Sequence, residues 1–96
     1  MAYKPKIVLQ APLRPGAPLE TFVEACLADG VELIAVVGDG CAEVHDLIDD
    51  IIVGDGADDT RCIATSWHTG ESLAEVVEFA SIYGSGDASG VEVVSL

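Results

Sequence analysis

The sequence predicts an α/β fold with a four-stranded, mostly parallel sheet, the order β-α-β-α-β-α-β and helices on both faces. Short apolar runs bounded by Gly and Pro alternate with stretches whose apolar residues recur every three or four positions. Strands that alternate with helices in this way form parallel sheets. The right-handedness of the crossovers leaves few topologies, and a Rossmann- or flavodoxin-like strand order 2-1-3-4 is preferred. With 96 residues, the chain forms a single α/β domain, residues 1–96.

The first half of the chain contains two predicted strands around a helix. Lys6–Gln10 is a short apolar run ended by a proline, which is typical of a buried strand. An amphipathic helix begins at Leu19 and stops at Gly30. Val31–Val37 is apolar apart from one glutamate, which predicts a strand covered on both faces. The apolar face of the helix that begins at Leu19 consists of Leu19, Phe22, Val23, Cys26 and Leu27.

The second half repeats this alternation. A second helix follows the turn Gly38–Gly40, and Asp39 is expected to cap it. Cys62–Ser66 predicts a third strand that runs into a loop containing Trp67 and His68. Ser72 and Glu75 have the spacing of a capping box, which starts a third helix at Ser72. Gly84–Gly90 is a predicted connection, and Val91–Val94 is the last strand.

Three loops are the expected location of any pocket, because ligands of such sheets bind beyond the carboxyl ends of the strands. These loops are Ala11–Pro18, Gly38–Cys41 and Ser66–Gly70. Trp67 is the chain's one tryptophan, and its large amphipathic ring suits either a recognition surface or a cover over the open end of the core. The candidate ligand- or partner-binding residues are Asp39, Trp67 and Glu71.

Cys41 and His68 are the candidate catalytic residues. Cys41 falls in the first turn of the second helix, where the helix dipole stabilises a thiolate. His68 lies in the loop at the end of the next strand and would act as the base, with Asp39 or Glu71 orienting it. The structural alternative is a small cysteine packed under the start of the helix.

Cofactor and metal sites find little support. Gly38–Gly40 begins like a dinucleotide fingerprint, but Glu43 occupies the position of the third glycine and would repel phosphate. Cys41, His45 and His68 could in principle share zinc, yet His45 sits at the margin of the apolar helix stripe. We therefore expect no cofactor and no metal, and we expect the acidic loop Gly54–Asp59 to be a solvated turn.

The charge of the chain excludes several classes of partner. Seventeen acids against four bases give a net charge of −13, which opposes binding to nucleic acid and to anionic membrane surfaces. The longest apolar run, Leu33–Val37, is far shorter than the roughly 20 residues of a membrane span. Three widely spaced cysteines without a Cys-x-x-Cys pair favour a cytoplasmic protein without disulfides.

The segment after the acidic loop resembles a small uncharacterised bacterial α/β domain family. Its members have Asp-Asp followed by Thr-x-Trp-His-x-x-Glu-x-Leu-x-Glu and an aromatic helix, and an upstream Gly-x-x-Cys…Asp. The resemblance implies a shared α/β fold and a common site at the rim, without implying a reaction. The matching residues are Gly38, Cys41, Asp46, Thr65, Trp67, His68, Glu71, Leu73, Glu75 and Phe79.

The sequence therefore favours a small acidic binding or interaction domain without catalysis, with its recognition site at the rim. Eight acids and no base lie between Asp39 and Asp59, and they either steer a basic protein partner or only keep the domain soluble. Val91–Leu96 as an edge strand would allow a homodimer. The alternative is a thiol-dependent hydrolase or transferase using Cys41 and His68. A sensor that binds a small molecule without chemistry is a third hypothesis.

Overall fold

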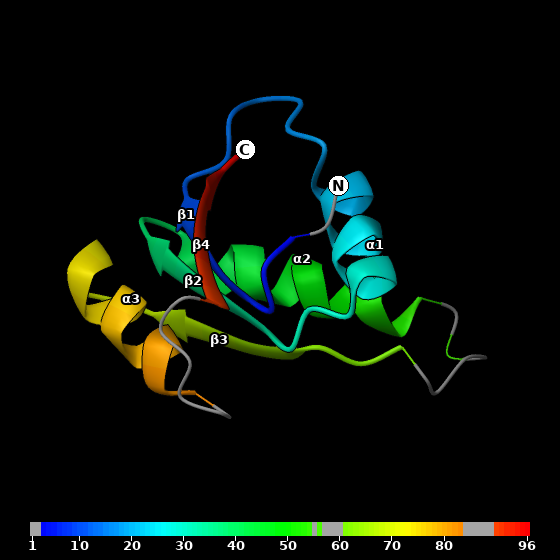
Figure 1. The fold of residues 1–96 in the computed structure, drawn as a ribbon. Coiled ribbons are helices and arrows are strands. Elements are labelled where there is room, and N and C mark those ends of the chain that lie inside the picture. Colours follow the sequence, from blue (N-terminus) through cyan, green and yellow to red (C-terminus); the bar gives the residue numbers. More distant parts are fainter. Residues whose placement is uncertain (1–2, 55, 57–60, 84–89) are drawn as a thin grey trace.

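The computed structural model describes residues 3–54, 56, 61–83 and 90–96, and its elements follow the predicted alternation (Figure 1). The predicted acidic loop and the Gly-rich connection before the last strand fall largely outside these residues. Among the described residues, no helix is both long and apolar enough to cross a membrane. The elements are β1 (Lys6–Ala11), α1 (Leu19–Asp29), β2 (Leu33–Gly38), α2 (Cys41–Val53), β3 (Ala64–His68), α3 (Leu73–Ile82) and β4 (Val91–Ser95).

The four strands form one parallel sheet in the order β3-β2-β1-β4. The predicted fold class is confirmed, and β1 and β2 are neighbours as in the expected order 2-1-3-4. The observed order differs in that β3 joins β2 and β4 takes the place beside β1. The burial of β2 explains the difference, because Leu33–Val37 is buried throughout and a strand covered on both faces belongs inside the sheet.

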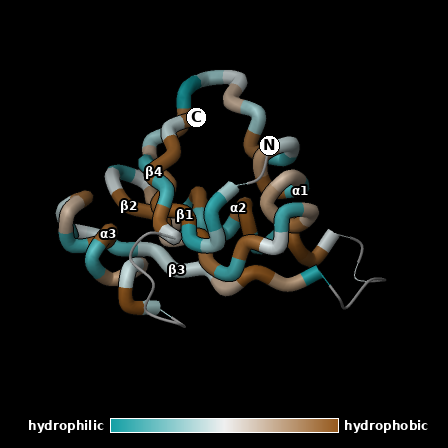
Figure 2. Tube along the Cα trace, viewed as in Figure 1, coloured by the Kyte–Doolittle hydropathy of each residue, from teal (hydrophilic) through white to brown (hydrophobic). Residues whose placement is uncertain are grey.

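The helices cover both faces of the sheet. α1 and α2 pack on one face over Ile7, Leu9, Ile34 and Val36, and α3 packs on the other face over β1 and β2 (Figure 1). Right-handed crossovers require this arrangement, since the chain moves outward from β1 to β3 and then returns across the sheet to β4. Hydrophobic residues accordingly concentrate in the central strands and the adjoining helix faces (Figure 2).

Several boundaries differ from prediction by one or two residues, and those of β3 and α2 affect the candidate site. β3 begins and ends two residues later than expected, so Trp67 and His68 belong to the strand and not to the loop. Arg61 explains the late start, because its guanidinium bonds the carbonyl oxygen of Ile52 and ties this segment to the end of α2. The prediction that Asp39 caps α2 is wrong: Gly40 is the N-cap, in a left-handed conformation, and no side chain caps the helix.

Candidate functional site

An open pocket lies at the carboxyl ends of β2 and β3, where the β2–α2 and β3–α3 loops meet. Its volume is about 450 Å³. Two of the three predicted loops contribute to it, whereas no residue of Ala11–Pro18, all of which are described, lines it. The pocket lies between β2 and β3. The topological switch point of the sheet is elsewhere, between β1 and β4, because the chain runs from β1 through β2 to β3 and then crosses back to β4. The lining residues are Gly38, Asp39, Gly40, Cys41, Ala42, Glu43, Thr69, Gly70 and Glu71.

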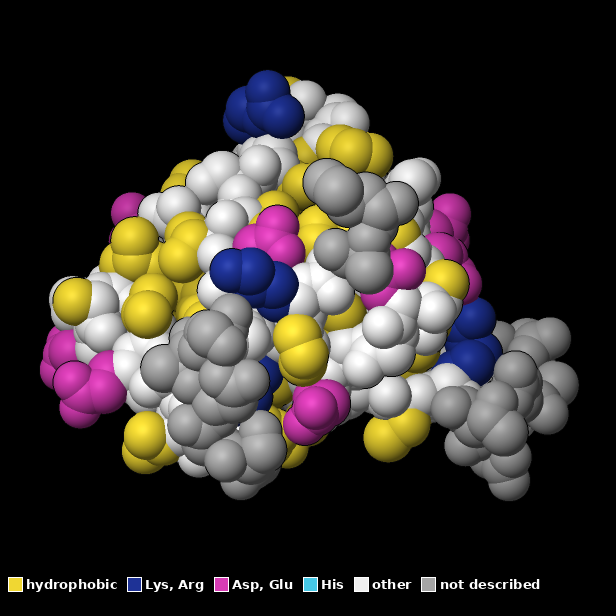
Figure 3. Space-filling view, in the orientation of Figure 1, with side chains coloured by type: hydrophobic (Ala, Val, Ile, Leu, Met, Phe, Trp, Pro, Cys, Tyr) yellow, Lys and Arg dark blue, Asp and Glu magenta, His cyan; other side chains and the backbone are white. Residues whose placement is uncertain are grey.

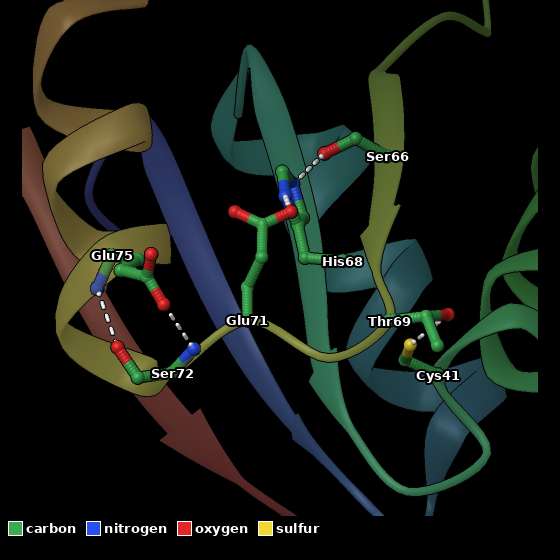
Figure 4. Close-up of polar contacts among 7 residues, drawn as sticks. All are labelled: Cys41, Ser66, His68, Thr69, Glu71, Ser72 and Glu75. Atoms are coloured by element: carbon green, nitrogen blue, oxygen red, sulfur yellow. Dashed lines mark hydrogen bonds and ion pairs between the residues drawn. The ribbon is translucent and has the colours of Figure 1, made fainter.

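Cys41 lines this pocket as the first residue of α2, as predicted. The side chain is only 2% exposed, and its Sγ lies 3.6 Å from the hydroxyl oxygen of Thr69 (Figure 4). This contact links the β2–α2 loop to the β3–α3 loop. Cys41 also belongs to the core cluster between the sheet and helices α1 and α2. The predicted packing role under the helix start therefore describes its contacts well.

His68 is buried on the opposite side of the sheet and contacts two other polar side chains. Its Nε2 lies 2.9 Å from the hydroxyl of Ser66, and its Nδ1 lies 3.0 Å from Oε2 of Glu71 (Figure 4). Because a carboxylate only accepts hydrogen bonds, Nδ1 donates to Glu71, and Nε2 of a neutral ring then accepts from Ser66. The ring also packs on Phe79 of α3, with centroids 4.8 Å apart.

The structure does not bring Cys41 and His68 together. Among the described residues, no hydrogen bond or ion pair joins them, and each side chain has other partners. The reason is the alternation of a strand, in which neighbouring side chains point to opposite faces. As the last residue of β3, His68 points to the face covered by α3, whereas Cys41 packs on the face covered by α1 and α2.

Trp67 points to the other face of β3, beside α2. Its ring is 51% exposed and lies against His45, with centroids 4.6 Å apart. About half of this residue therefore stays open to solvent, and the choice between a recognition surface and a cover over the core stays a prediction. Below it, the hydroxyl of Thr65 donates to Asp49 at 2.6 Å and lies 3.0 Å from Nε2 of His45.

Sequence reasoning named Thr65 only as a residue of the family motif, and it missed Ser66, Thr69 and the contacts of all three hydroxyls. Ser66 and His68 are two residues apart in a strand, and that spacing alone places them on one face. The signal was hidden because the predicted strand stopped at Ser66 and left His68 in a loop. Thr65 and Thr69 had no local signal, since their partners Asp49 and Cys41 come from a distant helix.

The capping box at the start of α3 fixes the end of the β3–α3 loop, as predicted. The Ser72 hydroxyl accepts from the Glu75 amide at 3.2 Å, and the Glu75 carboxylate accepts from the Ser72 amide at 2.8 Å (Figure 4). These hydrogen bonds lower the pKa of Glu75 because they favour its charged form. Glu71, one residue before the cap, is thereby held where it reaches both His68 and the pocket.

The surroundings of the site are acidic. Asp39, Glu43 and Glu71 line the pocket, and no lysine, arginine or histidine lines it. Figure 3 shows scattered basic side chains on one face of the domain and no extended basic patch. Within the described ranges, no group of three His, Cys, Asp or Glu side chains is arranged to hold a metal ion.

An open parallel sheet with helices on both faces and a pocket beyond its carboxyl ends defines a small doubly wound α/β domain. The model of one family, a domain of unknown function (DUF7684), matches residues 7–95. The chain therefore belongs to this family, in agreement with the resemblance to an uncharacterised domain family. The comparisons with curated proteins and with solved structures found no match.

Proposed function

We propose that this domain is a non-catalytic recognition module that receives a positively charged group of a protein partner or small ligand in the pocket between β2 and β3. The observation that carries the proposal is the charge of the pocket, which has three carboxylates among its lining residues and no base. Carboxylates around an open pocket attract a cation. A net charge of −13 extends that attraction over the surface and speeds encounter with a basic partner.

The cellular setting and assembly form part of the same proposal. The three cysteines are free and include the buried Cys26 and Cys41, which supports a cytoplasmic protein. β4 is an edge strand, and pairing of two β4 strands would give a homodimer. Sedimentation at several protein concentrations tests this assembly, because a homodimer shows a mass that rises with concentration.

The test of the pocket is a nuclear magnetic resonance titration with the tripeptide acetyl-Gly-Arg-Gly-amide. The expected result is amide shift changes concentrated at residues 38–43 and 69–71, because the guanidinium enters between the carboxylates. Added salt should weaken the binding, since exposed charges are screened. The neutral peptide acetyl-Gly-Gln-Gly-amide is the ligand control and should cause no such changes.

Two variants with the same change of charge separate the pocket from the general surface. Asp39→Asn removes a carboxylate of the pocket, and Glu20→Gln removes an exposed carboxylate of α1. We expect the first to weaken binding several-fold and the second to leave it nearly unchanged. Equal effects of both variants, or shifts spread evenly over the acidic surface, would contradict the proposal.

A second candidate function is hydrolysis of an acyl ester. The thiol-dependent hypothesis paired Cys41 with His68, but the contacts of His68 favour the hydroxyl of Ser66 instead. The His68 ring contacts the Ser66 hydroxyl through one nitrogen and the Glu71 carboxylate through the other. In catalytic triads, a nucleophile, its base and an acid that orients the base are joined in this way. Ser66 Oγ would attack the acyl carbon, His68 would pass the hydroxyl proton to the leaving alkoxide, and water would release the acyl group.

Covalent labelling distinguishes the two nucleophiles. A fluorophosphonate should label Ser66 and fail on Ser66→Ala and His68→Gln, whereas Ser81→Ala, a serine on α3, should label normally. Iodoacetamide reaction at Cys41 that depends on His68 would favour the thiol mechanism instead. If neither Ser66 nor Cys41 is labelled selectively, both catalytic hypotheses are rejected and only the proposed recognition function remains.

A further inference from the structure

The outer edge of β3 presents unpaired backbone groups. Within the described part of the chain, β3 is the last strand on its side of the sheet and pairs only with β2. The amide of Ala64 donates to the carbonyl of Glu32, so the backbone groups of Ala64 face β2. Because these groups alternate along a strand, those of Ser66 and the amide of His68 also face β2, whereas the His68 carbonyl accepts from the Glu71 amide. The amides and carbonyls of Thr65 and Trp67 therefore point to the free edge.

Among residues 3–54, 56, 61–83 and 90–96, this edge lacks the features that usually block strand pairing. Exposed edges are commonly protected by Lys, Pro, a bulge or a covering segment. The sequence Ala-Thr-Ser-Trp-His of β3 contains neither Lys nor Pro, and the strand is paired without a bulge.

Carboxylates lie beside β3 on both faces of the sheet. On the face of α2, Asp46 and Asp49 contact His45, and their side chains are 80% and 46% exposed. On the face of α3, the Glu71 carboxylate is 43% exposed. The base nearest in sequence, Arg61, is held by both carboxylate oxygens of Glu24. Side chains of an added strand would alternate between these two acidic faces.

We propose that the free edge of β3 accepts an extended, basic segment of a partner protein as a fifth strand of the sheet. The inference deepens the proposed recognition function and rests on it, because the edge leads directly into the pocket through Thr69, Gly70 and Glu71. Five paired residues span about 17 Å, and a basic side chain at the end of the segment would enter the pocket. A second copy fits less well, since two edges with the same acidic flanks repel each other.

The test uses the peptide acetyl-Lys-Val-Arg-Val-Lys-amide and its analogue with alternate amides N-methylated. Both peptides carry the same charge, but the analogue cannot complete backbone pairing. The expected result is that the first peptide slows hydrogen exchange of the Thr65 and Trp67 amides, leaves Ser66 unchanged and alters the fluorescence of Trp67. The analogue should bind about tenfold more weakly, because it loses several backbone hydrogen bonds.

Charge variants test the acidic flanks. Asp46→Asn should weaken the peptide several-fold, whereas Glu20→Gln should not. Equal binding of the two peptides would overturn the edge proposal and leave the pocket intact, since the tripeptide titration measures the pocket separately. Failure of the tripeptide with success of the long peptide would reject the pocket alone. A dimer in which the Thr65 and Trp67 amides are protected would assign the edge to a second copy.

Discussion

β1 and β3 belong to the same sheet, but the side chains of β1 pack in the apolar core, whereas those of β3 make mainly polar and aromatic contacts. Ile7, Val8 and Leu9 in β1 have no exposed surface, and they contribute to the core on both faces of the sheet. In β3, only His68 is buried, and the side chains of the last four residues make polar or aromatic contacts. The interior strand therefore supplies apolar side chains to the core, whereas the edge strand carries mainly polar and aromatic contacts.

The largest expected effect is a direct comparison of the two strands. Leu9→Ala should lower the free energy of unfolding by about 2–5 kcal/mol, because it leaves a cavity in a fully buried cluster. Trp67→Ala should cost about 1 kcal/mol or less, because the ring is half exposed. Chemical denaturation measures both. A larger loss for the tryptophan variant would contradict the division of roles.

The second prediction concerns the stability of the domain at different pH values. It depends on Cys26, which packs in the same core cluster as Ile7 and Leu9 of β1. Burial raises the pKa of the Cys26 thiol to about 12 from its ordinary 9.0. The folded state therefore keeps a proton that the unfolded chain releases. The resulting stability is complete below pH 9 and is lost as the pH rises toward 12, by up to about 1.4 kcal/mol per pH unit. Cys26→Ala should show a shallower loss in alkali, and an unchanged slope would refute the assignment.

On the side of β3, removal of one hydroxyl tests the polar contacts. Thr65→Val should cost about 1.5 kcal/mol, because the hydrogen bond to the Asp49 carboxylate disappears while the shape of the side chain is kept. Thr65→Ser retains the hydroxyl and should cost less. Thermal unfolding of the two variants gives the comparison, and equal losses would indicate that the methyl group matters more than the hydrogen bond.

The smallest expected effect concerns the capping box after β3. Ser72→Ala should cost about 1 kcal/mol, the usual effect of losing an N-cap side chain. The hydrogen bonds with Ser72 lower the pKa of Glu75, so their contribution is present above the unfolded pKa of that carboxyl and is lost as the pH falls through the folded value. The difference between wild type and variant should therefore shrink in acid. A constant difference down to low pH would oppose this account.

Local patterns were sufficient for much of the fold. Helix α1 begins at Leu19 and is followed by the left-handed Gly30, as the apolar spacing and the glycine predicted. The start of α3 was predicted from Ser72 and Glu75 because a capping box depends on residues only three apart. The end of β3 was not, because the strand is defined by its pairing with β2, and no local residue marks where that pairing stops.

The same distinction applies to the candidate site. Asp39, Cys41 and Glu71 line one pocket, as the position of their loops after parallel strands predicted. The pairing of Cys41 with His68 could not be judged from the sequence. It depends on which face of the sheet each side chain occupies, and a shift of the strand boundary moved His68 out of the predicted loop and onto the face opposite Cys41.

The sequence alone was sufficient to predict the alternation of strands and helices, the parallel sheet, the acidic surface and the residues that follow each strand. These properties depend on composition and on spacings within one element. Packing of the folded chain makes β3 an edge strand, gives His68 its partners Ser66 and Glu71, and leaves Trp67 half exposed. Those outcomes depend on packing between segments far apart in the chain, where burial of the more apolar β2 left the polar β3 at the margin.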